Sequence, residues 1–176
     1  MSRSKSIPVQ KSWKHCPVCG GVPVRSGSHP FVCRECGYRH YFSPCSAVGA
    51  ILLNDADQVL FIIRGKAPGK GLLGLPGGFV DAGETAEEAL VREVREELRL
   101  DVDTTQYIAS FPNKYSFAGV TIPVTDLFFA VTVRSLRTIR VQAGEIDGWT
   151  FRDPTSVRSK ELAFTTHRLA LQAWRQ

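Results

Sequence analysis

The stretch REVREEL, residues 92–98, places three carboxylates close together on any helix that includes it. Glu93 and Glu97 are four residues apart, and like charges at that spacing destabilise a helix by a few tenths of a kcal/mol. Together with Glu96 they repel one another unless a cation joins them. Mg²⁺ and Mn²⁺ prefer oxygen ligands and keep water and substrate phosphate in the rest of the coordination shell. The cluster therefore indicates a site for Mg²⁺ or Mn²⁺.

An exposed acidic flank is the alternative explanation for the same residues. At about 100° per residue, the three glutamates fall at the edge of an apolar stripe, where the core meets solvent. That stripe consists of Leu90, Val91, Val94 and Leu98. A solvated charge face would instead lie on the side of Arg95, but Arg92 could balance Glu88 and Glu96 across one turn of an exposed flank. The helix alone leaves both explanations open.

The start of this helix is marked by a capping pattern and a long loop. Thr85 and Glu88 form the pattern Thr-x-x-Glu, which predicts a helix from this point to about Leu98. Residues 64–84 before it contain seven glycines and two prolines, and a loop of this length inside a compact domain is usually functional. Its two lysines could neutralise phosphate groups, although a solvated loop explains them as well. These lysines are Lys66 and Lys70.

The rest of the chain contains apolar patterns typical of strands. Residues 46–53 and 58–64 are apolar and rich in β-forming residues, and the turn NDAD between them predicts a hairpin. Further strands are predicted at 107–111, 114–118, 121–133 and 148–153. An amphipathic helix is predicted at 165–175. This order of elements predicts an α/β domain with helices flanking the sheet.

Two CxxCG turns near the N-terminus, CPVCG at 16–20 and CRECG at 33–37, have the ligand types of a zinc site. Two thiolates three residues apart, followed by a glycine that tolerates positive φ, can bend around one side of a Zn²⁺ ion. The sequence thus predicts a structural zinc ribbon with a basic N-terminal tail at residues 1–45, including short strands at 22–26 and 31–35. The four predicted zinc ligands are Cys16, Cys19, Cys33 and Cys36.

Composition and charge limit the classes of protein that fit. The chain has 176 residues, 43% of them hydrophobic, which is enough to bury a core. No stretch approaches the roughly 18 apolar residues of a membrane span, and no apolar region of a secretory signal follows the basic start. Paired cysteines suit a reducing compartment, so a cytoplasmic location is expected. Residues 1–45 carry a formal charge of +6 and the remainder carries −1, so a nucleic-acid-binding role for the basic segment stays open.

The loop and the helix together resemble the signature of the Nudix hydrolases. Gly78, five residues, Glu84, seven residues and then R-E-V-x-E-E-x-x-L from Arg92 match that signature at every defined position except one. Arg99 stands where the family has glycine, and a non-glycine residue in a left-handed helix cap costs about 1 kcal/mol, so a different helix end is expected. The resemblance implies a Nudix-type α/β/α sandwich at 46–176, and metal-dependent hydrolysis of the pyrophosphate bond of a nucleoside diphosphate linked to another moiety.

The same resemblance implies roles for individual residues. One of the helix glutamates, or Glu145 from a later loop, would activate water. Arg92 would hold the catalytic carboxylate by charge-assisted hydrogen bonds, and Glu84 would support the loop and the helix. Gly77 and Gly78 would let the backbone turn sharply beside the metal site. The implied ligands of Mg²⁺ or Mn²⁺ are Glu93, Glu96 and Glu97.

The substrate is less sharply indicated than the reaction. A zinc ribbon ahead of a Nudix domain also resembles NADH pyrophosphatases, but their SQPW-type stretch does not follow Leu100 here. ADP-ribose, FAD or another dinucleotide is therefore expected as much as NADH. Arg64 could neutralise phosphates, and Phe111 or Tyr115 could stack on a base, although strand packing explains at least one of these aromatic residues. The expected partners are this nucleoside diphosphate derivative and, in a homodimer, a second copy of the chain.

A nucleic-acid-binding or regulatory protein is the competing interpretation. Its basic ribbon would contact phosphates and its Nudix domain would sense a nucleotide. Against this interpretation, the ribbon offers few aromatic residues and no dense basic stripe, and an intact set of glutamates would be superfluous in a regulator. A Nudix pyrophosphohydrolase is therefore the preferred prediction.

Overall fold

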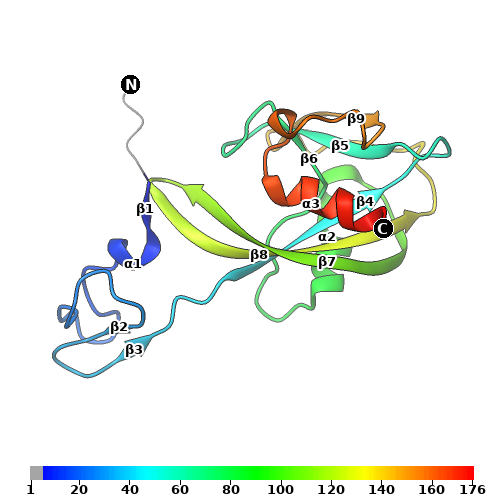
Figure 1. Cartoon of the computed structure of the whole chain (residues 1–176). Coiled ribbons are helices and arrows are strands. Elements are labelled where there is room, and N and C mark those ends of the chain that lie inside the picture. The colour runs from blue at the N-terminus through cyan, green and yellow to red at the C-terminus, as the bar shows by residue number, and fades with distance from the viewer. Residues whose placement is uncertain (1–5) are drawn as a thin grey trace. The chain divides into compact units, whose positions relative to one another are not determined.

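The computed structural model describes residues 6–176, which divide into two compact units (Figure 1). The first unit contains the described residues up to Pro44 together with Lys114–Pro123. The second contains Cys45–Asn113 and Val124–Gln176. None of the helices in residues 6–176 combines the length and the apolar character needed to cross a membrane.

Most of the strands belong to two sheets. They are β4 (Cys45–Leu52), β5 (Val59–Arg64), β6 (Leu73–Gly74), β7 (Val102–Phe117), β8 (Val120–Val133) and β9 (Ile146–Arg152). In one sheet β8 pairs with β7 and, in parallel, with β4. In the other sheet β5 lies between β6 and β9 and is antiparallel to both.

The predicted pairing of 46–53 with 58–64 as a hairpin is wrong. Strands form at both places, but β4 pairs with β8 and β5 pairs with β9, and between them the described residues form one isolated bridge, Leu53↔Val59. Both strands are continuously buried over most of their length. Such strands are covered on both faces, so the choice of partner depends on distant segments of the chain rather than on the short turn between them.

The predicted strands 107–111 and 114–118 are one continuous strand, β7. Pro112 lies inside it, and β7 has β8 as its strand partner among the described residues. A proline is tolerated in such an edge strand because its missing N–H does not interrupt a second ladder. The sequence prediction ended a strand just before Pro112, but an edge strand can continue through this proline.

Helices α2 (Ala86–Leu98) and α3 (Thr165–Trp174) cover opposite faces of the strands in the second unit. Alternate residues of β4 show this arrangement, since Ala50 and Leu52 pack in the α2 cluster whereas Ile51 packs in the α3 cluster. The α2 cluster includes Ala89, Leu90, Val94, Leu98 and Phe129, and the α3 cluster includes Phe61, Leu75, Phe128, Ala170 and Leu171. The predicted α/β/α sandwich is confirmed. A short 3-10 helix, η1 (Ser159–Glu161), precedes α3.

The first unit contains the cysteine segment and the far end of the β7–β8 hairpin. Its elements are β1 (Ile7–Pro8), α1 (Val9–Ser12), β2 (Phe31–Val32) and β3 (Arg39–His40). β1 pairs in parallel with the start of β8, and β2 pairs with β3. Of the two short strands predicted here, 22–26 forms only a bridge, Pro23↔Cys33, with its flanking hydrogen bonds, and only the first two residues of 31–35 form a strand, β2. A small aromatic core, in which the rings of Trp13 and His40 stack with centroids 4.4 Å apart, supports the cysteines.

Candidate active site

Helix α2 begins as the capping pattern predicts and ends in a way that the sequence did not predict. The Thr85 hydroxyl accepts a hydrogen bond from the Glu88 N–H at 3.1 Å, and the Glu88 carboxylate accepts one from the Thr85 N–H at 2.8 Å. Arg99 adopts the left-handed conformation that glycine would take, with φ 58° and ψ 34°. The expectation of a different helix end is therefore wrong. Leu100 is buried, and Arg140 donates its backbone N–H to the Leu98 carbonyl, so tertiary contacts hold this cap in place.

The three glutamates of α2 lie in a gradient from the core to the surface. The Glu97 residue is only 7% exposed, and the side chains of Glu93 and Glu96 are 15% and 50% exposed. The pKa of Glu97 is raised to about 8, mainly by burial and also by the negative charge of Glu93, against the lowering effect of the Gly77 N–H. Burial also raises the pKa of Glu93. Among residues 6–176 no Lys or Arg forms an ion pair with Glu97.

Arg92 links the helix to the loop before it. Its guanidinium donates two hydrogen bonds to Glu84, from Nη2 to Oε1 at 2.7 Å and from Nε to Oε2 at 3.1 Å. It also donates to Glu93 Oε1 at 2.8 Å and to the Phe79 carbonyl at 3.0 Å. The hydrogen bonds from Arg92 to Glu84 lower the pKa of the Glu84 carboxyl. The contact with Glu96 is longer, at 3.4 Å, so the guanidinium is directed mainly at the loop and at Glu93.

Gly77 and Gly78 bring the loop backbone against α2. Gly77 has φ 141°, and a Cβ there would lie 2.1 Å from the Val48 carbonyl oxygen. A Cβ at Gly78 would lie 2.3 Å from Glu93 Oε1. The Gly77 N–H donates to Glu97 Oε2 at 2.8 Å. Only residues without a side chain allow this approach, because any larger residue would displace β4 or the carboxylate.

Glu145 is placed close enough to the helix glutamates for its charge to act on them. Its negative charge contributes to the raised pKa values of Glu93 and Glu97. The loop lysine Lys66 forms an ion pair with Glu145, and the Gly65 N–H donates to the Glu145 carbonyl at 2.7 Å. The start of the long loop is thus attached to the residue that precedes β9.

The predicted substrate-contacting residues lie in different settings. Arg64 donates from Nε to the Pro68 carbonyl at 2.8 Å, its guanidinium carbon lies 5.1 Å from the centroid of the Phe164 ring, and its charge lowers the pKa of Glu97. Phe111 is half-buried and packs against the α3 cluster, with its ring centroid 6.3 Å from that of Phe128. Tyr115 is half-buried and belongs to the first unit.

Two buried polar residues escaped the sequence prediction. Asp126 of β8 is 7% exposed and accepts hydrogen bonds from Thr166 at 2.6 Å and Asn113 at 2.7 Å, while burial raises its pKa. His167 of α3 is 8% exposed and accepts a hydrogen bond from the Leu75 N–H at 3.2 Å. Asp126 lies in the predicted strand 121–133 and His167 lies in the predicted amphipathic helix 165–175, and one inward polar residue gives no recognisable pattern in either.

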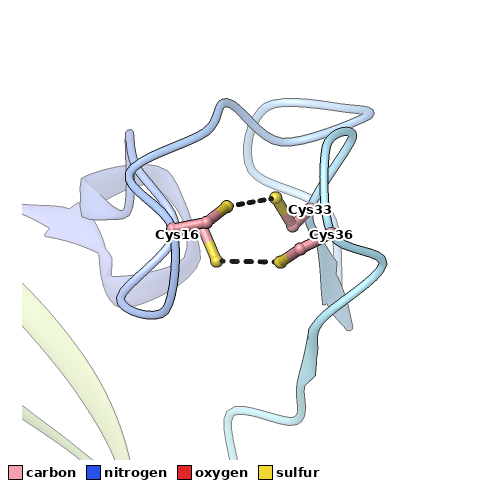
Figure 2. A group of neighbouring side chains, drawn as sticks. Cys16, Cys33 and Cys36 are labelled. Atoms are coloured by element: carbon pink, nitrogen blue, oxygen red, sulfur yellow. Dashed lines mark hydrogen bonds between the residues drawn. The ribbon is translucent and has the colours of Figure 1, made fainter.

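The four predicted zinc ligands come together in the first unit. Their sulfur atoms all lie within 4.8 Å of one another, with Cys16 and Cys36 at 3.7 Å and Cys19 and Cys33 at 3.5 Å. Figure 2 shows Cys16, Cys33 and Cys36 pointing toward one another from the two turns. The glycines that end the two turns, Gly20 and Gly37, have φ 77° and 71° as expected. The cluster has the donors and the spacing to hold a metal ion.

Known proteins are similar to parts of this chain's sequence. An ADP-ribose pyrophosphatase from Methanocaldococcus jannaschii is 51% identical over 63 residues, which make up 36% of this chain and 37% of that protein. The NAD-capped RNA hydrolase NudC from Stutzerimonas stutzeri is 34% identical over 98 residues, 55% of this chain and 35% of that protein. The chain thus spans less than two fifths of the length of either curated relative.

Structural and family comparisons cover more of the chain. The crystal structure of a Nudix hydrolase from Nitrosomonas europaea has a TM-score of 0.71 at 24% identity, and the alignment covers 91% of this chain and 89% of that chain. At this identity the likeness shows the fold alone. The sequence profile of the NUDIX domain matches residues 44–173. Because this match spans most of the chain, the protein belongs to the NUDIX domain family.

Proposed function

We propose that this protein hydrolyses the pyrophosphate bond of a nucleoside diphosphate linked to another moiety, with Mg²⁺ or Mn²⁺ held by Glu93, Glu96 and Glu97. The observation that carries the proposal is the buried Glu97 carboxyl, which lies beside Glu93 with a pKa raised to about 8. Two acidic groups in this setting favour a bound cation over separate ionisation. The names of the two curated relatives, which specify ADP-ribose and NAD-capped RNA, support this substrate class.

The donor set suits a hard divalent cation. The three groups are carboxylates. The guanidinium of Arg92 is hydrogen-bonded to Glu84 and does not neutralise the charge of an ionised Glu97. Carboxylate oxygen is the ligand that Mg²⁺ and Mn²⁺ prefer, with phosphate completing the shell. When bound, such a cation would neutralise charge on phosphate oxygens and make water easier to deprotonate.

The chain's own residues would orient the carboxylate ligands and accept the proton of the attacking water. Arg92 fixes one oxygen of Glu93, and the Gly77 N–H fixes one oxygen of Glu97. We assign Glu145 as the group that accepts a proton from the attacking water, because a carboxylate that does not ligate the cation keeps more of its basicity. Arg64, whose charge already acts on Glu97, would neutralise the substrate phosphates.

The proposal is tested by incubating the protein with ADP-ribose, NADH, FAD and NAD-capped RNA in the presence of Mg²⁺ or Mn²⁺. Turnover of at least one substrate is expected, and Glu97→Gln should abolish most of it. Glu87→Gln removes an equal charge from an exposed position of the same helix and should leave turnover unchanged. Absence of turnover of all four, together with salt-sensitive binding of RNA or DNA, would favour the regulatory interpretation instead.

For the first unit we infer a structural Zn²⁺ ion bound by Cys16, Cys19, Cys33 and Cys36. A tetrahedral site with Zn–S bonds near 2.3 Å requires sulfur atoms about 3.8 Å apart. The pairs at 3.7 and 3.5 Å are close to that value. This supports residues 1–45 as a zinc ribbon ahead of a Nudix domain at 46–176.

A further inference from the structure

The segment of residues 75–80, here called the glycine strap, is fixed along both of its edges. Along one edge it pairs with β4. The hydrogen bonds run from Ala50 N to Pro76 O at 2.8 Å, from Val48 N to Gly78 O at 2.8 Å and from Val80 N to Ser46 O at 3.0 Å. In an extended segment the odd-numbered residues direct their N–H and C=O groups to the opposite edge. That second edge has no strand partner in the part of the chain that the structure describes.

Three side chains take the place of that missing strand. Arg92 donates to the Phe79 carbonyl at 3.0 Å, and Glu97 accepts from the Gly77 N–H at 2.8 Å. The third is His167, whose Nδ1 accepts from the Leu75 N–H at 3.2 Å. Two of the three belong to the signature helix α2, whereas His167 comes from α3 on the other side of the sandwich.

His167 is held rigidly and presents one fixed acceptor. Its ring packs edge-on against the rings of Phe128 and Phe164, with centroids 5.8 and 5.3 Å away. Burial lowers its pKa to about 3, so the imidazole is neutral at physiological pH. Because Nδ1 accepts a hydrogen bond, the proton of the neutral ring lies on Nε2. His167 Nδ1 therefore stays unprotonated at physiological pH and remains an acceptor for the Leu75 N–H.

The strap needs this support because its centre is intrinsically loose. Gly77 lacks a side chain, so nothing of its own restricts the direction of its N–H. Its position is fixed by the residues around it: the carbonyl groups of Pro76 and Gly78 accept hydrogen bonds from β4, and Leu75, two residues before Gly77, donates its N–H to His167. Leu75 is 3% exposed, so its N–H would find no water if the acceptor were removed, and the backbone would have to move to satisfy it.

We infer that His167 is a positioning residue of the active site, which holds the glycine strap so that the Gly77 N–H orients the Glu97 carboxylate for cation binding. The inference rests on the proposed function in one respect, the role of Glu97 as a ligand of the cation. His167 itself would touch neither substrate nor metal. Groups that orient a metal ligand typically change metal affinity or activity by 10–100-fold when they are removed.

Two substitutions of His167 separate positioning from mere packing. His167→Asn keeps an acceptor at the position of Nδ1 but leaves a cavity, whereas His167→Leu nearly fills the space but removes the acceptor. A packing role predicts that the asparagine variant is the more damaged of the two. The positioning role predicts the opposite order for Mn²⁺ affinity, with His167→Leu weakened about tenfold or more and His167→Asn within about twofold of the wild type.

The experiment is a Mn²⁺ titration of the full chain, followed by electron paramagnetic resonance, with urea unfolding measured on the same samples. Leu171→Ala is the matched control, because Leu171 belongs to the α3 cluster with Phe128, against which His167 packs, and its apolar side chain offers no hydrogen-bond acceptor to the strap. This variant should lower stability and leave Mn²⁺ affinity unchanged. Equal Mn²⁺ affinity of His167→Leu and the wild type, or losses of Mn²⁺ affinity that follow the losses of stability across all three variants, would overturn the inference.

The variant Glu97→Gln separates this inference from the proposed function. If Glu97→Gln also binds Mn²⁺ normally, the proposed function fails. If only Glu97→Gln weakens Mn²⁺ binding, the positioning role alone fails.

Discussion

The guanidinium of Arg92 holds the carboxylate of Glu84 through two parallel hydrogen bonds, at 2.7 and 3.1 Å. This fork joins the end of the long loop to the second turn of α2, eight residues apart in sequence. The same guanidinium reaches Glu93 and the Phe79 carbonyl. A single planar cation thus fixes the relative positions of the loop, the helix and one proposed metal ligand.

Arg92→Lys is expected to reduce kcat/KM by about tenfold or more, because an ammonium group keeps the charge but cannot form the fork. Hydrogen bonds to charged groups contribute about 1.5–3 kcal/mol each, so a measurable fall in the urea midpoint is expected as well. Arg95→Lys, an exposed position on the same helix, is the control and should behave as the wild type. Unchanged kinetics for Arg92→Lys would show that charge alone is sufficient at this position.

Gly78→Ala adds only one methyl group, but it should displace the carboxylate of Glu93 from its place in the site. The added Cβ would lie 2.3 Å from Glu93 Oε1, so the carboxylate must move away from both Arg92 and its place beside Glu97. Loss of most hydrolytic activity is expected, together with weaker Mn²⁺ binding. Gly74→Ala is the matched control because its Cβ would make ordinary contacts, the nearest at 3.5 Å. Full activity of Gly78→Ala would mean that the position of Glu93 does not matter for the reaction.

The buried carboxyl of Glu97 makes the stability of the protein depend on pH when Mg²⁺ and Mn²⁺ are absent. Burial raises its pKa from an ordinary value of 4.5 to about 8 in the folded state. Because the folded value lies above the unfolded value, the stabilising effect is complete below pH 4.5 and is lost as the pH rises through about 8. The loss approaches about 1.4 kcal/mol for each pH unit in that interval.

Urea midpoints measured from pH 4 to pH 9 without divalent cations are therefore expected to fall through this interval in the wild type, and Glu97→Gln should flatten the fall. Glu87→Gln should keep the wild-type slope. Added Mn²⁺ should stabilise the wild type most at high pH, since the cation binds the ionised carboxylate. Parallel profiles for the wild type and Glu97→Gln would show that this carboxyl titrates normally.

Local patterns in the sequence predicted the features that depend on neighbours along the chain. The Thr85–Glu88 cap, the edge position of the glutamates and the two cysteine turns all depend on spacings of a few residues, and the structure contains each of them. Arg99 shows the limit of such reasoning. Its backbone preference opposes a left-handed cap by about 1 kcal/mol, but contacts of the buried Leu100 and of the 140–142 loop determine the conformation.

Features that depend on distant contacts could not be predicted in the same way. β4 and β5 are apolar on both faces, so their sequences carry no information about which strand lies beside them. Lys66 pairs with a residue 79 positions away, and His167 contacts a backbone N–H 92 positions away. An inward histidine on an amphipathic helix looks like any other polar residue in the sequence. Only the packed structure shows that its acceptor faces the glycine strap.

Cys16→Ser is expected to release zinc and loosen the described residues of the first unit while the second unit stays folded. The reason is that three thiolates no longer complete a tetrahedral site, and the small core of the first unit is built around two buried cysteines, Cys16 and Cys33. Zinc content and hydrogen exchange of the two units measure this directly. Cys45→Ser, outside the cluster, should retain zinc. Complete loss of hydrolysis by Cys16→Ser with a folded second unit would show that the ribbon takes part in substrate binding.

Glu145→Gln tests the assignment of the proton acceptor. General-base catalysis contributes about 10²–10⁴-fold to rate, so kcat should fall by about that factor while Mn²⁺ affinity changes little, because Glu145 is not a proposed ligand. Lys66→Met provides the comparison, since it removes the ion-pair partner of Glu145 and leaves its carboxylate in place; kcat for this variant should stay within about tenfold of the wild type. If Glu145→Gln retains wild-type kcat, one of the three glutamates of α2 must accept the proton, and the cation would then have to share that carboxylate with the water.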